Sequence, residues 1–355
     1  MARIALVHDV AGIGAIQAEL LRKAGHEVDQ ISLPVIGASW DWPMKGFAIP
    51  LRLAAYLPTA MRLGPSRYDV VHVHWLTHGL VGVLSRRPFF VQAHGSDLHL
   101  NLNNRMYRWV TRTVLRKAKT VFYVTPNLRA YMRDYDQKLM YLPNPVGMRG
   151  VASAPAASGM VKKVLIFTRL DPVKGVERIF PAVERLAARF QVTALDWGPL
   201  TREYVANYAS WVRFVKPIPH AEIGSFLSEF DVVIGQMRQG ILSLMEIETL
   251  AAGRPLISAI DWSLYADDPP PAVDASDPDA IVAAVERLAA EPSQLTRLSS
   301  EGREWALRNH SYAHHLELLE SAYFGTPASA RESGAGTGQV AADVADDERA
   351  LPRHE

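Results

Sequence analysis

The chain has 355 residues, which is longer than most single cores and indicates two domains of ordinary size plus a remainder. Its composition, 48% hydrophobic and 21% charged, is that of a globular protein with enough apolar side chains for two cores. A formal net charge of +1 provides no global field that would favour a nucleic acid partner. The absence of cysteine excludes disulfides, thiolate metal sites and a cysteine nucleophile, and it fits a reducing cytoplasm.

The first residues, MARIALVHDVAGIG, predict a β-strand rather than a signal peptide, because His8, Asp9 and two glycines interrupt the apolar run. No apolar segment approaches the ~20 residues that a membrane-spanning helix needs. We therefore expect a cytoplasmic protein that is soluble or lies on the surface of the inner membrane.

The first half alternates apolar runs with helix-period segments, the pattern of a parallel, doubly wound α/β sheet. The expected strands are residues 4–8, 26–33, 69–75, 88–94, 121–124 and 140–142, and a helix is expected at 15–24. Residues 34–65 carry five prolines and predict a loop with short helices, broken at Pro58. Gly12 and Gly14 predict either a plain tight turn or a loop that a ligand approaches closely, and their spacing is too short for a dinucleotide fingerprint.

Residues 151–160, VASAPAASGM, are small and predict a linker, after which the alternation begins again. The second half predicts strands at 164–167, 192–195, 212–215, 231–234 and 256–259, and helices at 176–189, 221–229, 278–290 and 299–309. We therefore expect two Rossmann-like domains, 1–150 and 161–310, with a ligand cleft between them. A helix at 311–324 is expected to pack back toward the N-terminal domain, and the tail 325–355 to be disordered.

The stretch 240–258, GILSLMEIETLAAGRPLIS, carries the strongest signal for a ligand site. It follows an apolar strand and opens into a helix that stops at Gly253. A strand, loop and helix of this kind present free backbone N–H groups at the carboxyl edge of a sheet, where anions collect. Glu248 lies near the end of this helix, and spacing alone favours a solvated helix residue over a ligand-binding carboxylate.

Two cations follow the first strand of the second half, in the segment FTRLDPVKGV at 167–176. Arg169 offers a two-donor fork and Lys174 a point charge, so this loop is able to hold a diphosphate. An ordinary solvated loop is the alternative.

Several short motifs spread over both halves form a set. In the second half they are RLDPVKG at 169–175, WGP at 197–199, VRFVKPIP at 212–219 and ETLAAGRP at 248–255. In the first half they are DVVHVH at 69–74, HGSD at 94–97 and LPNPV at 142–146. Together they resemble glycosyltransferase family 4, from the first strand to about residue 324. The Arg/Lys loop and the Glu248 helix are the most specific parts of the resemblance.

The resemblance implies a GT-B fold: two facing Rossmann-like domains, with a nucleotide-sugar donor held by the second and an acceptor by the first. It implies that Arg169 and Lys174 act in catalysis by stabilising the leaving diphosphate, and that Glu248 accepts hydrogen bonds from the ribose. Family members retain the anomeric configuration and need neither metal nor cofactor. The remaining positions that the resemblance assigns to the donor side are Gly198, Gly240, Ile241 and Leu242. Those assigned to the acceptor or sugar side are Gly12, Gly14, His94 and Asp97.

His94 ends a strand where the cleft is expected, and the resemblance places it near the reacting face of the sugar as a hydrogen-bond donor. A histidine satisfied by the backbone is the alternative. His72 and His74 alternate along one strand, which favours a packed sheet surface over a metal site completed by His78.

One position departs from the family. Its members usually carry two glutamates eight positions apart, of which the second corresponds to Glu248. Gly240 stands where the first would be, so the side chain expected to contact the donor sugar is missing. Arg238, Gln239 or nearby backbone N–H groups are candidates to replace it, whereas Glu246 should point elsewhere on the helix.

The segment 105–119, RMYRWVTRTVLRKAK, is the most basic in the chain. At helical spacing its cations form one stripe and its apolar residues another. The stripe consists of Arg105, Arg108, Arg112, Arg116 and Lys119. A solvated helix face is the favoured interpretation. The alternative, which Trp109 beside the stripe supports, is a peripheral contact with anionic lipid or a phosphorylated acceptor.

We therefore expect a retaining, metal-independent glycosyltransferase that moves a hexose from a nucleotide-diphosphate sugar, UDP- or GDP-linked. The acceptor is a glycan, a lipid-linked molecule or a small molecule. One alternative is a catalytically degenerate GT-B protein that binds nucleotide or glycan without transfer, because Gly240 replaces the glutamate. A second is a UDP-sugar epimerase of the same architecture, for which no residue gives a specific sign.

Overall fold

The computed structural model describes residues 1–34, 36–37, 40, 48–64, 67–99, 102, 105–147 and 160–325. The chain forms two compact units. Unit 1 comprises Met1–Pro145 together with the chain from Tyr312 onward, and unit 2 comprises Val146–Ser311. The predicted linker at 151–160, except for Met160, and the predicted tail beyond residue 325 lie outside the described residues.

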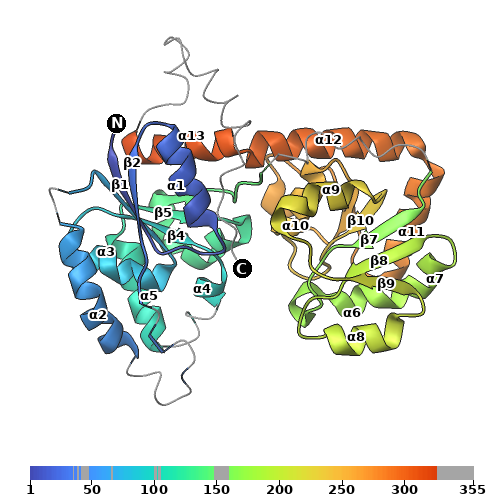
Figure 1. Ribbon diagram of the computed structural model, residues 1–355, viewed down its shortest axis with the longest axis horizontal. Helices are drawn as coiled ribbons and strands as arrows, with labels where there is room; N and C mark the ends of the chain where they lie inside the picture. Colours follow the sequence, from blue (N-terminus) through green and yellow to red (C-terminus); the bar gives the residue numbers. More distant parts are fainter. Residues whose placement is uncertain are drawn as a thin grey trace, which may run out of the picture. The chain divides into compact units, whose positions relative to one another are not determined.

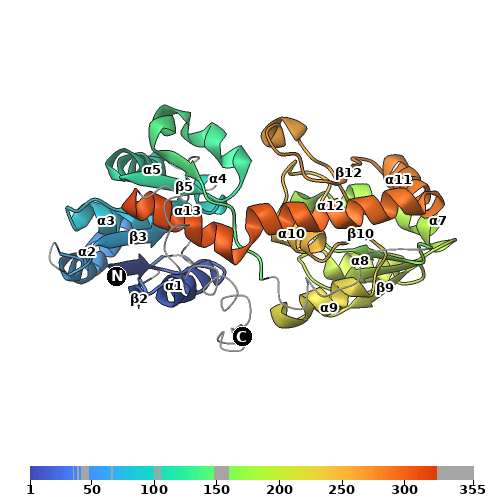
Figure 2. The ribbon, with the colours of Figure 1, turned by 90° about the horizontal axis from the view of Figure 1, so that it is seen from above.

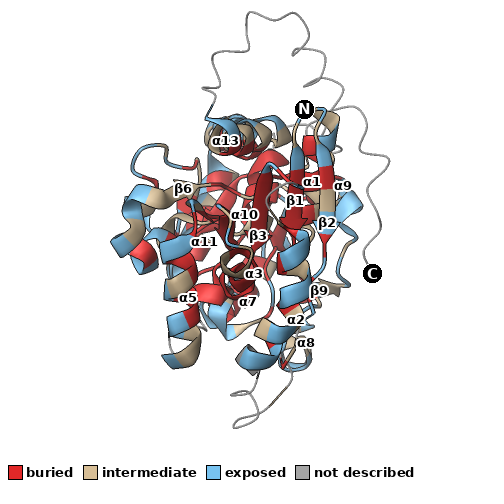
Figure 3. Ribbon diagram, turned by 90° about the vertical axis from the view of Figure 1, so that its left-hand side faces the viewer, coloured by how far each residue is buried: buried red, intermediate tan, exposed pale blue. Residues whose placement is uncertain are grey.

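Unit 1 contains a sheet of six parallel strands in the order β2-β1-β3-β4-β5-β6. Figure 1 labels β1, β2, β4 and β5 of this sheet. The strands are β1 (Arg3–Val7), β2 (Glu27–Ile31), β3 (Val70–His74), β4 (Phe90–Ala93), β5 (Thr120–Tyr123) and β6 (Leu139–Tyr141). Helices cover both faces, so the inner strands are buried on both sides, and Figure 3 shows them as buried. This burial explains why apolar runs located the inner strands β1, β3, β4 and β5 in the sequence.

The helices of unit 1 lie between and beside these strands. They are α1 (Ile13–Lys23), α2 (Ala48–Arg62), α3 (Leu80–Leu84), α4 (Ser96–His99), α5 (Arg105–Lys117) and α13 (Tyr312–Phe324), with 3₁₀ helices at Leu76–Gly79 and Pro126–Lys138. The last helix, α13, packs beside α1. Its Leu319 and Tyr323 join a core with Ile4 and Leu6 of β1 and Leu21 of α1.

Unit 2 contains a second sheet of six parallel strands in the order β12-β11-β10-β7-β8-β9. The strands are β7 (Lys163–Ile166), β8 (Gln191–Leu195), β9 (Val212–Val215), β10 (Val232–Ile234), β11 (Leu256–Ser258) and β12 (Val273–Asp274). The prediction of two Rossmann-like domains is confirmed.

The helices of unit 2 include α12, which passes beside α10 (Figure 2). They are α6 (Val176–Ile179), α7 (Val183–Ala187), α8 (Thr201–Tyr208), α9 (Ile223–Ser228), α10 (Leu244–Ala251), α11 (Pro278–Ala290) and α12 (Pro292–His310). The 3₁₀ helices are Pro172–Lys174, Phe180–Ala182, His220–Glu222 and Trp262–Tyr265. In the part of the chain that is described, no helix combines the length and apolar composition needed to cross a bilayer.

Several elements differ from the sequence prediction, which did not include α3, α4 or α8. The segment predicted as loop and short helices contains α2, which continues through Pro58. Burial of Tyr56 and Ala60 on either side of the proline holds this helix together despite the missing N–H. The single helix predicted at 176–189 is divided by a 3₁₀ turn at Phe180–Ala182, which contains Pro181. The short strand β12 was missed, because two residues give no periodic signal.

Candidate functional site

Each sheet has a point at which the strand order reverses, and loops that leave the carboxyl ends of strands there form ligand sites in open α/β sheets. In unit 2 this point lies between β7 and β10. Arg169 and Lys174 follow β7, and Gln239 and Gly240 follow β10. In unit 1 the same point lies between β1 and β3.

The loop after β7 is fixed by its contact with the loop after β8. The Leu170 N–H donates to the Trp197 carbonyl at 2.8 Å, and the Leu200 N–H donates to the Leu170 carbonyl at 3.0 Å. Gly198 permits this approach, because a Cβ on its backbone (φ +136°) would lie 2.4 Å from the Leu170 carbonyl oxygen. The Arg169 guanidinium lies 5.6 Å from the centre of the Trp197 ring. The structure thus brings Arg169 and Gly198 together.

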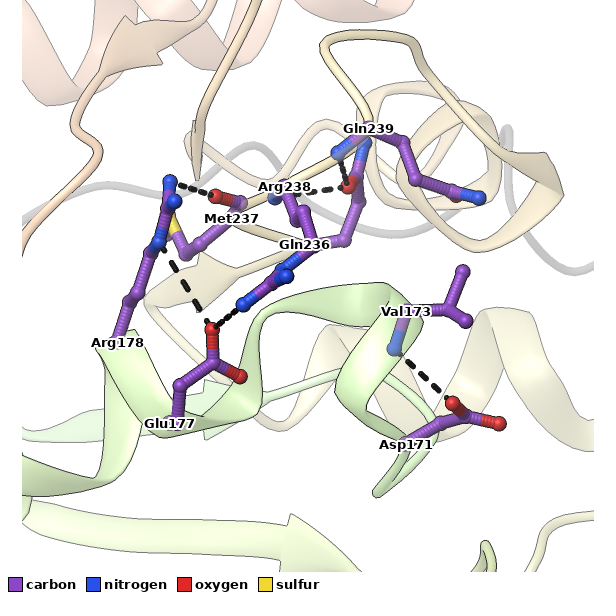
Figure 4. A network of polar contacts seen from close by, with 8 residues as sticks. All are labelled: Asp171, Val173, Glu177, Arg178, Gln236, Met237, Arg238 and Gln239. Carbon is purple, nitrogen blue, oxygen red and sulfur yellow. Dashed lines mark hydrogen bonds and ion pairs between the residues drawn. The ribbon is translucent and has the colours of Figure 1, made fainter.

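Lys174 is tied to the loop after β10. Its carbonyl accepts from the Met237 N–H at 2.8 Å, and its Nζ donates to Oε1 of Gln239 at 2.9 Å. The 3₁₀ turn that carries it begins at Asp171, whose Oδ1 accepts from the Val173 N–H at 3.0 Å (Figure 4). Gly175 then adopts φ +73°, and a Cβ there would lie 2.9 Å from the Met237 carbonyl carbon. The loops after β7 and β10 therefore form one connected surface.

Gln236 organises the loop after β10, and sequence reasoning missed it. Its side chain is fully buried, and its Oε1 accepts from the backbone N–H groups of Arg238 at 3.2 Å and Gln239 at 2.7 Å (Figure 4). Its Nε2 donates to the Ile241 carbonyl. The available signal was a single polar residue directly after a buried strand. A pattern search for charged ligands does not select an amide at that position.

Arg238, one of the two side chains considered as replacements for the missing glutamate, pairs with another residue of unit 2 instead. Its guanidinium pairs with the Glu177 carboxylate of α6, while Arg178 of α6 donates to the Met237 carbonyl at 3.0 Å (Figure 4). Of the two side chains considered as replacements for the missing glutamate, Gln239 is thus the one that contacts Lys174.

Glu246 and Glu248 lie two residues apart on α10 and have different partners. The buried carboxylate of Glu246 accepts from the backbone N–H groups of Ser243 and Gln236, both at 2.9 Å, which anchors the start of the helix. Glu248 is 3% exposed, so the interpretation as a solvated helix residue is wrong. Its Oε1 lies 3.0 Å from Nε2 of His220, whose side chain is 62% exposed.

The residues at the expected glutamate position are closely packed. Gly240 has φ +69°, and a Cβ there would lie 3.1 Å from the Asp261 Cβ. Its carbonyl accepts from the Asp261 N–H at 2.9 Å. The Leu242 N–H was expected to be an available donor for the ligand, but it donates to the Tyr265 hydroxyl at 2.8 Å. Ile241, like Leu242, packs its side chain into the interior.

In unit 1, His94 follows β4 directly and is partly exposed. Gly95 next to it adopts φ +103°. Asp97 stabilises this turn, because its Oδ1 accepts from the N–H groups of His94 at 3.1 Å and Gly95 at 2.9 Å. Its Oδ2 accepts from the Leu76 N–H at 3.0 Å. Asp97 was expected on the acceptor side, but its side chain is completely buried, and burial raises the pKa of its carboxyl above the usual value despite these three donors.

Left-handed backbone at non-glycine residues is concentrated at the same edge of this sheet. His8 (φ 65°) and Ala11 (φ 53°) follow β1, and Trp75 (φ 73°) follows β3. Such conformations cost free energy and gather at functional sites. Gly12 continues the loop with φ +77°, and a Cβ at this position would meet open space. Gly14 donates its N–H to Asp9 Oδ1 at 2.7 Å, which starts α1.

Histidines line the interior behind His94. Nδ1 of His74 lies 3.1 Å from Nε2 of His94, and Nδ1 of His72 lies 2.6 Å from the Tyr323 hydroxyl. Nδ1 of His78 lies 2.6 Å from the Tyr56 hydroxyl. Burial lowers the pKa of His72, His78 and His94 to about 3, and that of His74 well below 6.5. Among the described residues, no group of three or more His, Asp or Glu side chains is placed to hold a metal ion.

The basic helix α5 is amphipathic, as the sequence predicted. Val110, Val114 and Ala118 are buried in the core of unit 1. All five cations of the predicted stripe are exposed, and Trp109 is 62% exposed. The apolar side of the helix thus packs inward, and a basic face with one aromatic ring points to solvent.

The two tandem Rossmann-like domains define a protein of the GT-B fold class. Solved glycosyltransferases have the same fold, although their sequence identity to this chain is low. Sucrose-phosphate synthase of Thermosynechococcus elongatus matches with a TM-score of 0.69 and 18% identity over 91% of this chain and 98% of that one. HepE of Anabaena in complex with UDP matches with a TM-score of 0.70 and 12% identity over 92% and 100% of the two chains.

Matches to family models identify the family of glycosyltransferases to which the chain belongs. The glycosyl transferase 4-like domain matches residues 15–145, and a glycosyl transferase-like domain matches residues 174–321. The two ranges together cover more than half of the chain, which therefore belongs to the family-4 type of glycosyltransferases and uses a nucleotide-sugar donor. A curated relative is the GDP-mannose-dependent alpha-(1-6)-phosphatidylinositol monomannoside mannosyltransferase of Mycolicibacterium smegmatis, 26% identical over 65% of this chain and 69% of its own.

Proposed function

We propose that this glycosyltransferase transfers a hexose with retention of anomeric configuration and without a metal ion. The observation that carries the proposal is the pair of cations on the loop after β7, held at the strand-order reversal of unit 2 by the loops after β8 and β10. Arg169 and Lys174 supply the positive charge that a leaving diphosphate requires. Lys174 has a neutral side-chain partner, Gln239, so its charge is available to an anion.

In the proposed reaction, the bond between the anomeric carbon and the diphosphate oxygen breaks, and its electron pair leaves with the diphosphate. An acceptor hydroxyl oxygen bonds to the anomeric carbon, and its proton goes to the departing phosphate oxygen. His94 donates a hydrogen bond to the sugar. Because burial holds its pKa near 3, the ring is neutral and donates from a single N–H at physiological pH.

Glu248 is proposed to bind the donor ribose. The buried carboxylate lies against the exposed ring of His220, so a pair of hydroxyls that displaced this ring would meet a carboxylate acceptor. The base and the sugar stay open, since HepE was solved with UDP and the mycobacterial relative uses GDP-mannose.

The acceptor is proposed to be a glycan, a lipid-linked molecule or a small molecule in the cytoplasm. The exposed face of α5 supports approach to an anionic membrane surface, since it combines several cations with Trp109 and carries no carboxylate between residues 105 and 119. In a flotation assay with phosphatidylglycerol vesicles, the wild-type protein should be recovered in the vesicle fraction. The double variant Arg112→Glu/Arg116→Glu should not be recovered there. Equal recovery of both proteins would reject the membrane contact.

Donor profiling tests the function itself. Thermal denaturation in the presence of UDP-, GDP- and ADP-sugars should raise the melting temperature with one class, and that donor should then support transfer in an acceptor screen. Binding without transfer or donor hydrolysis would instead favour the degenerate binding protein. The close packing of Gly240 against Asp261 supports this second candidate, since left-handed backbone and a tight contact disfavour a side chain there. No stabilisation by any sugar nucleotide would reject both.

A further inference from the structure

His94 is held by a second histidine that no assigned role includes. His74, on β3, is fully buried, and its Nδ1 lies 3.1 Å from Nε2 of His94. Its ring also stacks on His94, with centroids 5.3 Å apart. Within the described residues, Nε2 of His74 has no hydrogen-bond partner. The Nδ1 of His94 is the remaining nitrogen of the pair and belongs to the partly exposed ring.

Both rings are neutral, and this fixes how many protons they share. Burial lowers the pKa of each far below 6.5, and the neighbouring His8 and His72 oppose charging further. Each neutral ring carries one N–H. A hydrogen bond between His74 Nδ1 and His94 Nε2 uses one proton, so only two arrangements are available.

The two arrangements differ in what they leave buried. If His94 donates, His74 must carry its own proton on Nε2, which would be a buried N–H without an acceptor. If His74 donates, its Nε2 is a bare lone pair, and His94 carries its proton on Nδ1. An orphaned buried donor is rarer and more costly than an orphaned acceptor. The register partner of His74, Gln92, also offers a buried side-chain N–H that has no partner, which favours an acceptor on the neighbouring ring.

We propose that His74 is a positioning residue that holds His94 in the Nδ1–H tautomer, so that Nδ1 donates to the transferred sugar. The proposal rests on the proposed function only for the sugar contact. The tautomer itself is a property of unit 1 alone. Free histidine favours the Nε2–H tautomer, so without His74 the ring would present a lone pair where a donor is needed.

The surroundings of His74 keep its ring in place. His72 stacks on it with centroids 4.8 Å apart and an interplanar angle of 14°. His72 is in turn held by the Tyr323 hydroxyl of α13 at 2.6 Å. Tyr323 of the C-terminal helix is therefore linked through His72 to the ring that orients His94.

The tautomer is tested by ring-nitrogen NMR on protein labelled with ¹⁵N-histidine, with His94 assigned from its loss in His94→Gln. Between pH 6 and 8 we expect the two-bond ¹H–¹⁵N correlations of the His94 ring to show the pattern of the Nδ1–H tautomer. An Nε2–H pattern in the wild type overturns the proposal, whether or not the protein transfers sugar.

Kinetics test the consequence with matched substitutions. His74→Phe keeps a stacked ring but removes the donor, and kcat should fall about tenfold or more with donor KM within about twofold. His74→Asn places an amide N–H near the Nδ1 position and should restore most of the activity. Arg62→Ala, at a half-exposed residue of α2 in the same unit, serves as the control, with tautomer and kcat unchanged.

Equal kcat in wild type and His74→Phe, or an equal loss in His74→Asn and His74→Phe, overturns the proposal. If His74→Phe does not fold, the wild-type spectrum and His74→Asn decide. If the wild type transfers no sugar from any donor, the proposed function has failed, and the NMR measurement still tests the role of His74 separately.

Discussion

Acidification should destabilise unit 1 far more steeply than a protein with solvated histidines. The perturbation is a decrease from pH 6.5 to 5.5, and the responsible groups are His72, His74, His78 and His94. Their pKa values are lowered by burial in the folded state and return to about 6.5 in the unfolded chain. The unfolded state therefore binds more protons, and the free energy of unfolding falls as the pH falls.

The magnitude follows from proton uptake by the unfolded chain. One histidine that stays neutral when folded contributes a loss of about 1 kcal/mol between pH 6.5 and 5.5, so four contribute about 4 kcal/mol. His8, whose pKa burial also lowers, adds to the loss, whereas Asp97, whose pKa burial raises, acts in the opposite direction. A change of about 4 kcal/mol is a large part of the 5–15 kcal/mol that stabilises a typical domain.

Urea unfolding at pH 6.5, 6.0 and 5.5, with hydrogen exchange to follow peptides of unit 1, measures this loss. His72→Phe removes one titrating ring and should reduce the pH-dependent loss by about 1 kcal/mol, whatever its effect on stability at pH 7. A free energy of unfolding that stays constant or increases between pH 6.5 and 5.5 would refute the neutrality of these rings.

Three further predictions concern unit 2 and the pH dependence of catalysis. Gly198→Ala should lower the stability of unit 2 by about 2 kcal/mol in urea titrations, while Gly12→Ala, with open space around it, should cost about 1 kcal/mol; equal costs would contradict the close approach to Leu170. Glu246→Ala should cost about 2–3 kcal/mol, because two backbone N–H groups lose their acceptor, and a cost below 0.5 kcal/mol would count against that role. The profile of kcat against pH should show no inflection from His94 near 6.5, since its pKa lies near 3; an inflection that His94→Gln removes would contradict this.

The strands were predictable because parallel strands buried on both faces are continuous apolar runs. In β3, for example, all five residues are buried, including His72 and His74. The loops that carry Arg169 and Lys174 were predictable for a related reason, since they follow such strands directly. The roles assigned to them, to Glu248 and to His94 stay predictions.

The burial of Glu248 was not predictable from spacing, because the ring that covers one of its oxygens comes from His220, on a different element. Gln236 escaped notice for a similar reason: its importance depends on three backbone groups that the loop brings around its side chain only after folding. The contact of His74 with His94 joins the ends of two neighbouring strands. The continuity of α2 through Pro58 depends on packing that local propensity does not contain.

The central claim is that unit 2 binds the diphosphate of a sugar nucleotide through Arg169 and Lys174. Calorimetric titration of the full chain with UDP and with GDP measures it directly. One of the two nucleotides should bind, and Arg169→Ala should weaken that binding about tenfold or more, since a charge-assisted contact is lost. Arg189→Ala, which removes an exposed arginine paired with Glu286 in the same unit, should leave the affinity unchanged. Failure of both nucleotides to bind, or an unchanged affinity in Arg169→Ala, would contradict the claim.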